Sequence, residues 1–242
     1  MSSLSNVIPD EVCGRVILDL GCGYGRSMYV ISERCTRSYI VGIDIDCSKL
    51  AKALKNLTNR SYYDLICSDI SKLPLRNNSI SSASAILTLH EVSKYHVNLI
   101  LEELLRVMKH HGILLIIDKV ITKFSTPSEE LTIITEEAYH KSKEYSTGYK
   151  SWGVRKPSEI IDRITQFNFM LIRSNIVKVG KWISGNEFLK SWGKETLHMY
   201  KLIKDPSKKK EVETLINRVK SIAKNYGYGP HRLLIAIFRK IS

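Results

Sequence analysis

Residues 16–27 read VILDLGCGYGRS, an apolar run followed directly by glycines at positions 21, 23 and 25. Glycine lacks a Cβ atom, so it permits a tight turn and lets the backbone come close to a ligand. A helix that begins after such a turn points its first amide groups at that ligand. The stretch therefore predicts a strand, a ligand-binding turn and a helix, which together open an α/β nucleotide fold.

Acidic residues stand at the ends of three successive apolar runs. Asp19 precedes the first glycine, Asp44 ends the run VGID, and Asp69 follows in CSDI. An α/β nucleotide site places a carboxylate at the second of these positions, where it binds ribose hydroxyls. A dinucleotide fingerprint would read G-x-G-x-x-G, and its third glycine is missing because Arg26 stands there. The spacing favours a different adenosine-containing cofactor.

Short apolar runs alternate with amphipathic segments in the first half of the chain. The strand-like runs are residues 16–20, 39–43, 62–67, 83–87 and 113–117. Residues 97–109 repeat apolar side chains at helical spacing, which predicts a helix packed on one face of the sheet. This alternation predicts βαβ units and a parallel sheet.

The second half carries longer helical segments and two late strands. Thr126-Pro127-Ser128-Glu129 combines a helix cap, a first-turn proline and a capping acid, so we expect a helix from there to about Tyr145. Residues 182–228 predict two amphipathic helices joined by KDPSKKKE. The other expected elements are a helix over 157–164, a strand over 169–179 and an antiparallel last strand over 233–238.

The net charge of +13 is distributed unevenly over the 242 residues. Residues 1–118 contain 13 Lys plus Arg against 12 Asp plus Glu, whereas residues 119–242 contain 24 against 12, together with every Phe and Trp. A basic and aromatic half suits an anionic partner such as RNA, a phosphorylated metabolite or a membrane surface. A lysine-rich solvated surface would give the same counts, so both interpretations stay open.

Cysteine spacing and hydropathy bear on the environment of the chain. The five cysteines, at 13, 22, 35, 47 and 67, are odd in number and form no C-x-x-C pair, which predicts reduced thiols and no metal site. No stretch is long and apolar enough to span a bilayer, and the first residues lack the pattern of a secretion signal. We therefore expect a cytoplasmic protein without a membrane span.

These segments resemble, in order and spacing, the motifs of class I S-adenosylmethionine-dependent methyltransferases. The resemblance covers residues 12–118, and ILTLHEV with ELLRVMKHHGILLIID is most similar to the methyltransferase type 11 and quinone-biosynthesis C-methyltransferase group. It implies an α/β fold: a seven-stranded, mostly parallel, Rossmann-like sheet with helices on both faces and a reversed last strand. It also implies one domain over residues 1–242, with an acceptor-binding half at 119–242 whose helical lids are about 124–155 and 182–228.

The resemblance further implies roles for matching positions. Residues under the methionine moiety of S-adenosyl-L-methionine would be Asp19, Gly21, Cys22, Gly23, Tyr24 and Gly25. The ribose and adenine would lie against Asp44, Ile45, Asp69 and Ile70, and Leu87 and Thr88 would line the sulfonium side. Asp46 is expected to be a helix cap instead of a second ribose ligand.

His90 is the candidate catalytic residue, because the implied geometry places it beside the methyl group, where a base would help an oxygen or carbon acid react. The alternative is that His90 and Glu91 merely cap the strand end, since the sequence identifies no partner for the imidazole. Several aromatic side chains could line an acceptor pocket or be core of the added helices. They are Tyr139, Tyr145, Tyr149, Trp152, Trp182, Phe188 and Trp192.

Three functions follow as hypotheses. The first is an enzyme that methylates a small organic acceptor, and the second, suggested by the basic half, is a tRNA or rRNA methyltransferase. The fourth strand lacks the Asn/Asp-Pro-Pro-aromatic motif of exocyclic base amine methylation and the cysteine pattern of pyrimidine C5 methylation, which argues against those two RNA chemistries. The third is a non-catalytic module that binds S-adenosylmethionine for regulation. The sequence does not indicate an oligomeric state.

Overall fold

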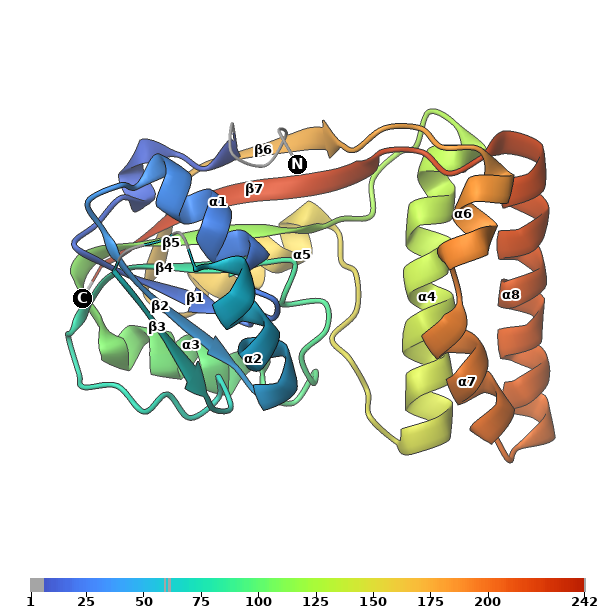
Figure 1. Cartoon of the computed structure of the whole chain (residues 1–242), viewed down its shortest axis with the longest axis horizontal. Coiled ribbons are helices and arrows are strands. Elements are labelled where there is room, and N and C mark those ends of the chain that lie inside the picture. Colours follow the sequence, from blue (N-terminus) through green and yellow to red (C-terminus); the bar gives the residue numbers. More distant parts are fainter. Residues whose placement is uncertain (1–6, 59, 61, 242) are drawn as a thin grey trace.

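The computed structural model describes residues 7–58, 60 and 62–241, and within them seven strands form one sheet in the order β3-β2-β1-β4-β5-β7-β6 (Figure 1). Strands β1 to β5 pair in parallel, whereas β7 is antiparallel to both β5 and β6. The bounds are β1 Val16–Leu20, β2 Tyr39–Asp44, β3 Tyr63–Cys67, β4 Ile80–Ile86, β5 Met108–Lys119, β6 Phe169–Val179 and β7 His231–Lys240. The predicted Rossmann-like sheet with a reversed last strand is confirmed.

Alternate residues of the central strands bury their side chains on opposite faces of the sheet. Leu18 packs with the cluster that contains α3 (Val97–Val107) and α5 (Pro157–Thr165). Its neighbour Ile17 packs with the cluster that contains α1 (Arg26–Arg34) and α2 (Cys47–Asn56). Leu18 and Ile17 are both fully buried, and each such side chain contributes about 1.5–3 kcal/mol to stability. The sheet is therefore fixed between two apolar layers.

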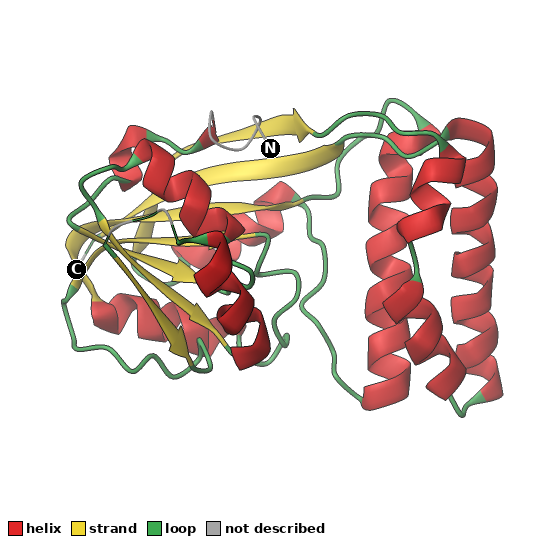
Figure 2. Ribbon diagram, viewed as in Figure 1, coloured by secondary structure: helices red, strands yellow, loops and turns green. Residues whose placement is uncertain are grey.

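Four helices form a lobe beyond one end of the sheet, and Figure 2 shows that this lobe contains no strand. They are α4 Pro127–Thr147, α6 Gly185–Ser191, α7 Lys194–Leu202 and α8 Pro206–Tyr226. Apolar side chains of α4, α6 and α8, among them Leu131, Phe188 and Val219, form a separate small core. Strands β6 and β7 lead into the lobe, so the sheet and the helices share continuous chain (Figure 1). No helix within the described residues is long and apolar enough to cross a membrane.

The helical segments begin where the chain offers caps. The side-chain oxygen of Thr126 accepts a hydrogen bond from the Glu129 amide at 3.3 Å, as predicted, and the helix continues to Thr147. The expectation of two helices over 182–228 is wrong, because the segment forms three. KDPSKKKE is not a linker: Asp205 caps α8, Pro206 occupies its first turn, and the lysines that follow are helical.

The cysteines differ from the expectation of reduced thiols. Cys13 is bonded to Cys35 and Cys47 to Cys67, and Cys22 is free and buried. The first bridge joins the η2 turn (Asp10–Val12) to the end of α1, and the second joins the start of α2 to the end of β3. Counting and spacing missed both pairs because the partners are 22 and 20 residues apart and come together only when the strands align.

Candidate active site

The glycine turn adopts a backbone that other residues resist. Gly21 has φ +65°, and a Cβ built on it would lie 2.5 Å from Thr88 Cγ2. Gly25 has φ +76° and is the residue that precedes α1. Two constraints therefore act on this turn, left-handed backbone and close packing, and only glycine satisfies both at position 21.

Asp44 ties the glycine turn to the end of β2. Its Oδ2 accepts a hydrogen bond from the Gly23 amide at 2.8 Å, and its Oδ1 accepts one from the Asp46 amide at 2.8 Å. Each carboxylate oxygen can accept a further bond, and the side chain lines the main cavity. Asp46 caps α2, accepting from the amides of Ser48 and Lys49, as expected. Asp44 is thus held in place and remains able to bind hydroxyl groups.

Asp69 and two isoleucines border the same cavity. The Asp69 carboxylate accepts hydrogen bonds from the Ser71 amide and hydroxyl, both at 2.8 Å. Ile45, directly after β2, is 71% exposed, whereas Ile70, which follows Asp69 after β3, is buried. An exposed isoleucine next to ordered carboxylates suits a flat apolar ring that would cover it.

Leu87, Thr88 and Tyr24 continue the lining. Leu87 has φ +54°, and its amide donates to the Ile117 carbonyl at 2.7 Å. The Thr88 hydroxyl donates to the Leu20 carbonyl at 2.9 Å, which anchors the end of β4 to the end of β1. The implied sulfonium side therefore lies where two neighbouring parallel strands end.

Three predicted cofactor residues lie behind the lining instead of in it: Asp19, Cys22 and Gly25. Asp19 is fully buried and accepts hydrogen bonds from the hydroxyls of Ser27 and Ser84, the second at 2.7 Å. Burial raises the pKa of Asp19 to about 6, although both hydroxyls oppose the shift. Burial likewise raises the pKa of the Cys22 thiol. These side chains support the turn from beneath.

The main cavity, of about 1090 Å³, extends from the glycine turn to the helical lobe. Pockets for ligands typically hold 300–1,000 Å³, so this volume suits a nucleoside cofactor with a second molecule beside it. The lobe contributes acidic, basic and aromatic side chains, namely Glu136, Tyr139, Lys143, Trp192, Glu195 and Tyr228. The cavity therefore has a cofactor end and an acceptor end.

The candidate aromatic residues divide between this cavity and the core. Tyr139, Tyr149 and Trp192 line the cavity. The others do not: Tyr145 donates to Glu211, Trp152 packs on the sheet core, Trp182 is exposed and Phe188 stacks on Tyr228. Tyr139, Tyr149 and Trp192 thus line a pocket, whereas Trp152 and Phe188 belong to the apolar cores.

His90 has a buried partner, Asp118, which the sequence did not indicate. Its Nδ1 lies 2.5 Å from Asp118 Oδ1, and its amide donates to Asp118 Oδ2 at 3.1 Å. Burial opposes protonation of the imidazole, yet the Asp118 carboxylate outweighs it and raises the pKa of His90 above its usual range. The side chain is only 5% exposed, and His90 does not line the main cavity. Glu91 and Glu136 do line this cavity, and both approach His90 Nε2, at 3.7 and 3.8 Å.

Sequence reasoning did not find Glu136, Lys119, Lys143 or Tyr228. Lys119 Nζ lies 2.5 Å from Glu136 Oε1, so an ion pair joins β5 to α4 at the acceptor end. The pKa of Glu91 is lowered to about 2, because the neighbouring imidazoles and Lys143 outweigh the effect of burial. The one available signal was the spacing of Glu136 and His140, which places both on one face of a helix.

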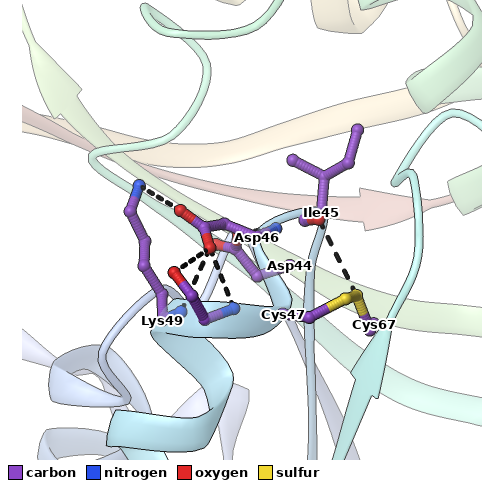
Figure 3. Close-up of a disulfide and its surroundings, with 7 residues drawn as sticks. Asp44, Ile45, Asp46, Cys47, Lys49 and Cys67 are labelled. Carbon is purple, nitrogen blue, oxygen red and sulfur yellow. Dashed lines mark hydrogen bonds and ion pairs between the residues drawn. A yellow bond between two sulfur atoms is a disulfide. The ribbon is translucent and has the colours of Figure 1, made fainter.

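The Cys47–Cys67 bridge borders the cofactor end (Figure 3). Cys47 follows Asp46 directly, and Cys67 pairs with Asp44 across the sheet. The Ser68 amide donates to the Asp44 carbonyl at 3.0 Å, which continues the pairing beyond the bridge. The bridge therefore links the two segments that carry the implied ribose and adenine contacts.

The residues present fit S-adenosylmethionine. The turn offers bare backbone, Asp44 offers free acceptor positions for hydroxyls, and Ile45 offers an uncovered apolar surface. Because Gly21, Gly23, Asp44 and Ile45 line one cavity, a nucleoside with an amino-acid tail matches their distribution.

Comparison with known proteins agrees with this geometry. Residues 18–116 match the family described as "Methyltransferase domain". A malonyl-(acyl-carrier protein) O-methyltransferase of Legionella pneumophila is 30% identical over 105 residues, which are 43% of this chain and 36% of that protein. One of Marinomonas sp. is 31% identical over 64 residues, 26% of this chain and 24% of the relative. The matched region thus spans about a third or less of these relatives.

Solved structures extend the likeness in fold to the whole chain. A Bacillus halodurans protein provisionally assigned as a methyltransferase has a TM-score of 0.65 at 16% identity and covers 100% of both chains. The cyclase SpnF has a TM-score of 0.62 at 20% identity, covering 98% of this chain and 79% of its own. Geranyl diphosphate C-methyltransferase of Streptomyces coelicolor, solved with S-adenosyl-L-homocysteine, has a TM-score of 0.56 at 12% identity, covering 99% and 80%.

Residues 18–116 match a methyltransferase domain, and the whole chain has the Rossmann-like fold of the class I S-adenosylmethionine-dependent methyltransferases. Because a cyclase shares this fold, the fold alone does not define the reaction.

Proposed function

We propose that the chain binds S-adenosyl-L-methionine and transfers its methyl group to a small organic acceptor. The observation that carries the proposal is a continuous cavity whose lining runs from Gly21 and Asp44 to Tyr139 and Trp192. Curated relatives of the matched region methylate malonyl-(acyl-carrier protein), which supports an organic acceptor of modest size at the reacting end.

Catalysis would come mainly from alignment. S-adenosylmethionine supplies a methyl group that is already activated for in-line displacement. The turn from Gly21 to Gly25, Asp44 and Asp69 would fix the donor, while the lobe would orient the acceptor and exclude water. The segments about 124–155 and 182–228 would form the lid, although α4 and α8 also have their own packed core.

A base role for His90 would need a relay in this arrangement. Its Nε2 lies 3.7 Å from Glu91 Oε1 and 3.8 Å from Glu136 Oε2, and these carboxylates face the cavity. A proton from an oxygen or carbon acid would therefore pass through one of them before reaching the imidazole. Asp118 would orient the ring in either case.

The second candidate acceptor is RNA, which the basic second half favours. The two disulfides favour an oxidising compartment over the cytoplasm that the cysteine pattern led us to expect, because reducing compartments keep thiols free.

Incubation with cell extract and radiolabelled S-adenosylmethionine tests the proposal. The extract is then separated into small molecules, RNA and protein. We expect label in the small-molecule fraction, and its loss in an Asp44→Ala variant. Label confined to RNA would contradict the small acceptor and identify RNA as the acceptor. Absence of label despite tight cofactor binding would favour a non-catalytic, cofactor-binding module.

A further inference from the structure

Two histidines and two glutamates gather at the acceptor end of the cavity. His90 and Glu91 belong to the loop after β4, and Glu136 and His140 lie one turn apart on α4. Glu91 Oε1 is 3.7 Å from His90 Nε2 and also 3.7 Å from His140 Nε2, while Glu136 Oε2 is 3.8 Å from His90 Nε2. One donor atom each of His90, Glu91 and Glu136 falls within 4.8 Å of the other two.

The imidazole of His90 is oriented for a ligand. Asp118 holds Nδ1, which leaves Nε2 directed at the two glutamates, and no hydrogen-bond partner of Nε2 occurs within the part of the chain that the structure describes. The side chain is only 5% exposed, so a ligand or a water molecule in the cavity would complete the bonding of this nitrogen. A carboxylate bound to the second nitrogen of a histidine is the usual support of a metal-ligating imidazole.

The glutamates are oriented by lysines. Lys119 occupies Glu136 Oε1 at 2.5 Å, and Lys143 lies 3.8 Å from Glu91 Oε2. The other oxygen of each carboxylate, Glu136 Oε2 and Glu91 Oε1, faces the histidines. Each lysine therefore takes one oxygen and leaves its neighbour for a shared cation.

His140 adds a fourth donor. Its Nε2 is buried and has no hydrogen-bond partner among the described residues. Its ring centroid lies 5.9 Å from that of His90. An imidazole nitrogen left in this state costs stability unless a ligand or water reaches it.

We propose that His90, Glu91 and Glu136, with His140 as the nearest fourth donor, bind a divalent transition-metal ion such as Zn²⁺ or Co²⁺. Metal–ligand bonds of about 2.1 Å in a tetrahedral site separate ligand atoms by roughly 3.4 Å. The distances from His90 Nε2 to the two glutamates, 3.7 and 3.8 Å, need a small contraction, and the two glutamate oxygens, which lie within 4.8 Å of each other, need to move closer by rotation of their side chains. Mixed imidazole and carboxylate donors favour such ions over Mg²⁺, which prefers oxygen alone.

A metal here would deepen the proposed function, on which this step rests. Because Glu91 and Glu136 line the cavity, the ion would face the acceptor and could bind an oxygen of it, which makes that oxygen a better nucleophile. Coordination through Nε2 would also occupy the atom that a base role requires. The two roles of His90 therefore exclude each other.

Titration of Zn²⁺ and Co²⁺ into the tag-free, chelator-treated chain tests the proposal, with calorimetry for stoichiometry and visible absorption for Co²⁺ geometry. We expect one ion per chain, binding at micromolar concentration or tighter, and at least tenfold weaker binding in both Glu91→Gln and Glu136→Gln. Glu137→Gln, the exposed neighbour on α4, is the matched control and should bind like the parent chain.

Binding of S-adenosylhomocysteine is measured on every sample. A chain that binds this ligand but no metal, or whose metal affinity is equal in all variants, overturns the metal site and leaves the proposed function intact. A chain that takes the metal but not the nucleoside contradicts the proposed function instead. If one glutamate variant fails to fold or to bind the nucleoside, the metal affinity of the other variant tests the site.

Discussion

At the scale of single residues, Asp44 connects the glycine turn to the nucleoside pocket through hydrogen bonds from the Gly23 and Asp46 amides. Replacing Asp44 by Ala should weaken S-adenosylhomocysteine binding by about 1–3 kcal/mol, because the ribose hydroxyls lose a charged acceptor. Calorimetry provides the dissociation constant. Asp64→Ala removes an exposed acid from the adjacent strand and should leave that constant unchanged. Equal affinities in the two variants would refute the role of Asp44.

Gly21 is constrained twice, by φ +65° and by Thr88. Gly148 provides the comparison, because it has φ +77° with nothing within 4 Å of a built Cβ. Gly148→Ala should cost about 1–2 kcal/mol of unfolding free energy from the backbone alone. Gly21→Ala should cost a further 1–3 kcal/mol, roughly the price of overpacking. Urea unfolding measures both, and similar losses would show that the contact with Thr88 is easily relieved.

The residues of the cofactor end were predictable because each belongs to a short local pattern. A strand, a glycine turn and an acid follow one another within a dozen positions, so sequence order and spatial order agree. Asp118 and Glu136 were not predictable as neighbours of His90, because 28 residues separate Asp118 from it in sequence and only the parallel pairing of β4 and β5 brings them together.

At the scale of elements, Glu129 joins α4 to the last two strands. Its carboxylate lies 2.5 Å from Lys178 Nζ on β6 and 2.7 Å from Arg232 Nη2 on β7. The hydrogen bond from Lys178 and, less strongly, that from Arg232 lower the pKa of Glu129 to about 2 against the effect of burial. A depressed pKa stabilises the fold above the unfolded value, and this contribution is lost as the pH falls through the folded value.

We therefore expect the parent chain to lose unfolding free energy relative to Glu129→Gln as the pH falls from roughly 4.5, near the unfolded pKa of glutamate, to about 2. Urea unfolding at several pH values provides the difference. Glu130→Gln is the control, since the half-buried Glu130 pairs only with Arg218 among the described residues. A constant difference between parent and Glu129→Gln over this range would contradict the prediction.

The two disulfides should differ in their effect on ligand binding. Each closes a loop of about 20 residues, so replacing either pair by serines should cost roughly 3 kcal/mol of stability. The pair Cys47→Ser and Cys67→Ser should also weaken S-adenosylhomocysteine binding severalfold, because that bridge holds the ribose and adenine segments together. The pair Cys13→Ser and Cys35→Ser should not, and equal effects on affinity would contradict this distinction.

Element prediction succeeded where one periodicity dominated. Strands β1, β2 and β5 contain nearly continuous apolar runs, as expected for strands covered on both faces. It failed over 182–228, where Trp192 and Gly193 divide one expected helix into α6 and α7. The lysine run after Pro206 suggested a solvated linker, but lysine is a good helix former and Asp205 supplies a cap.

At the scale of the whole molecule, the sheet and the helical lobe share one cavity, with the glycine turn and strand-end acids at one end and polar and aromatic side chains of the lobe at the other. The first end follows from the sequence because its geometry is built on backbone. The second depends on where α4 lies relative to the end of the sheet and on how α7 packs on α4, which no local pattern determines.

Calorimetric titration of the purified chain with S-adenosylhomocysteine tests the central claim most directly, with a nicotinamide dinucleotide as the comparison ligand. We predict saturable binding of S-adenosylhomocysteine at one site per chain and no heat from the dinucleotide. Binding of the dinucleotide without binding of S-adenosylhomocysteine would contradict the account.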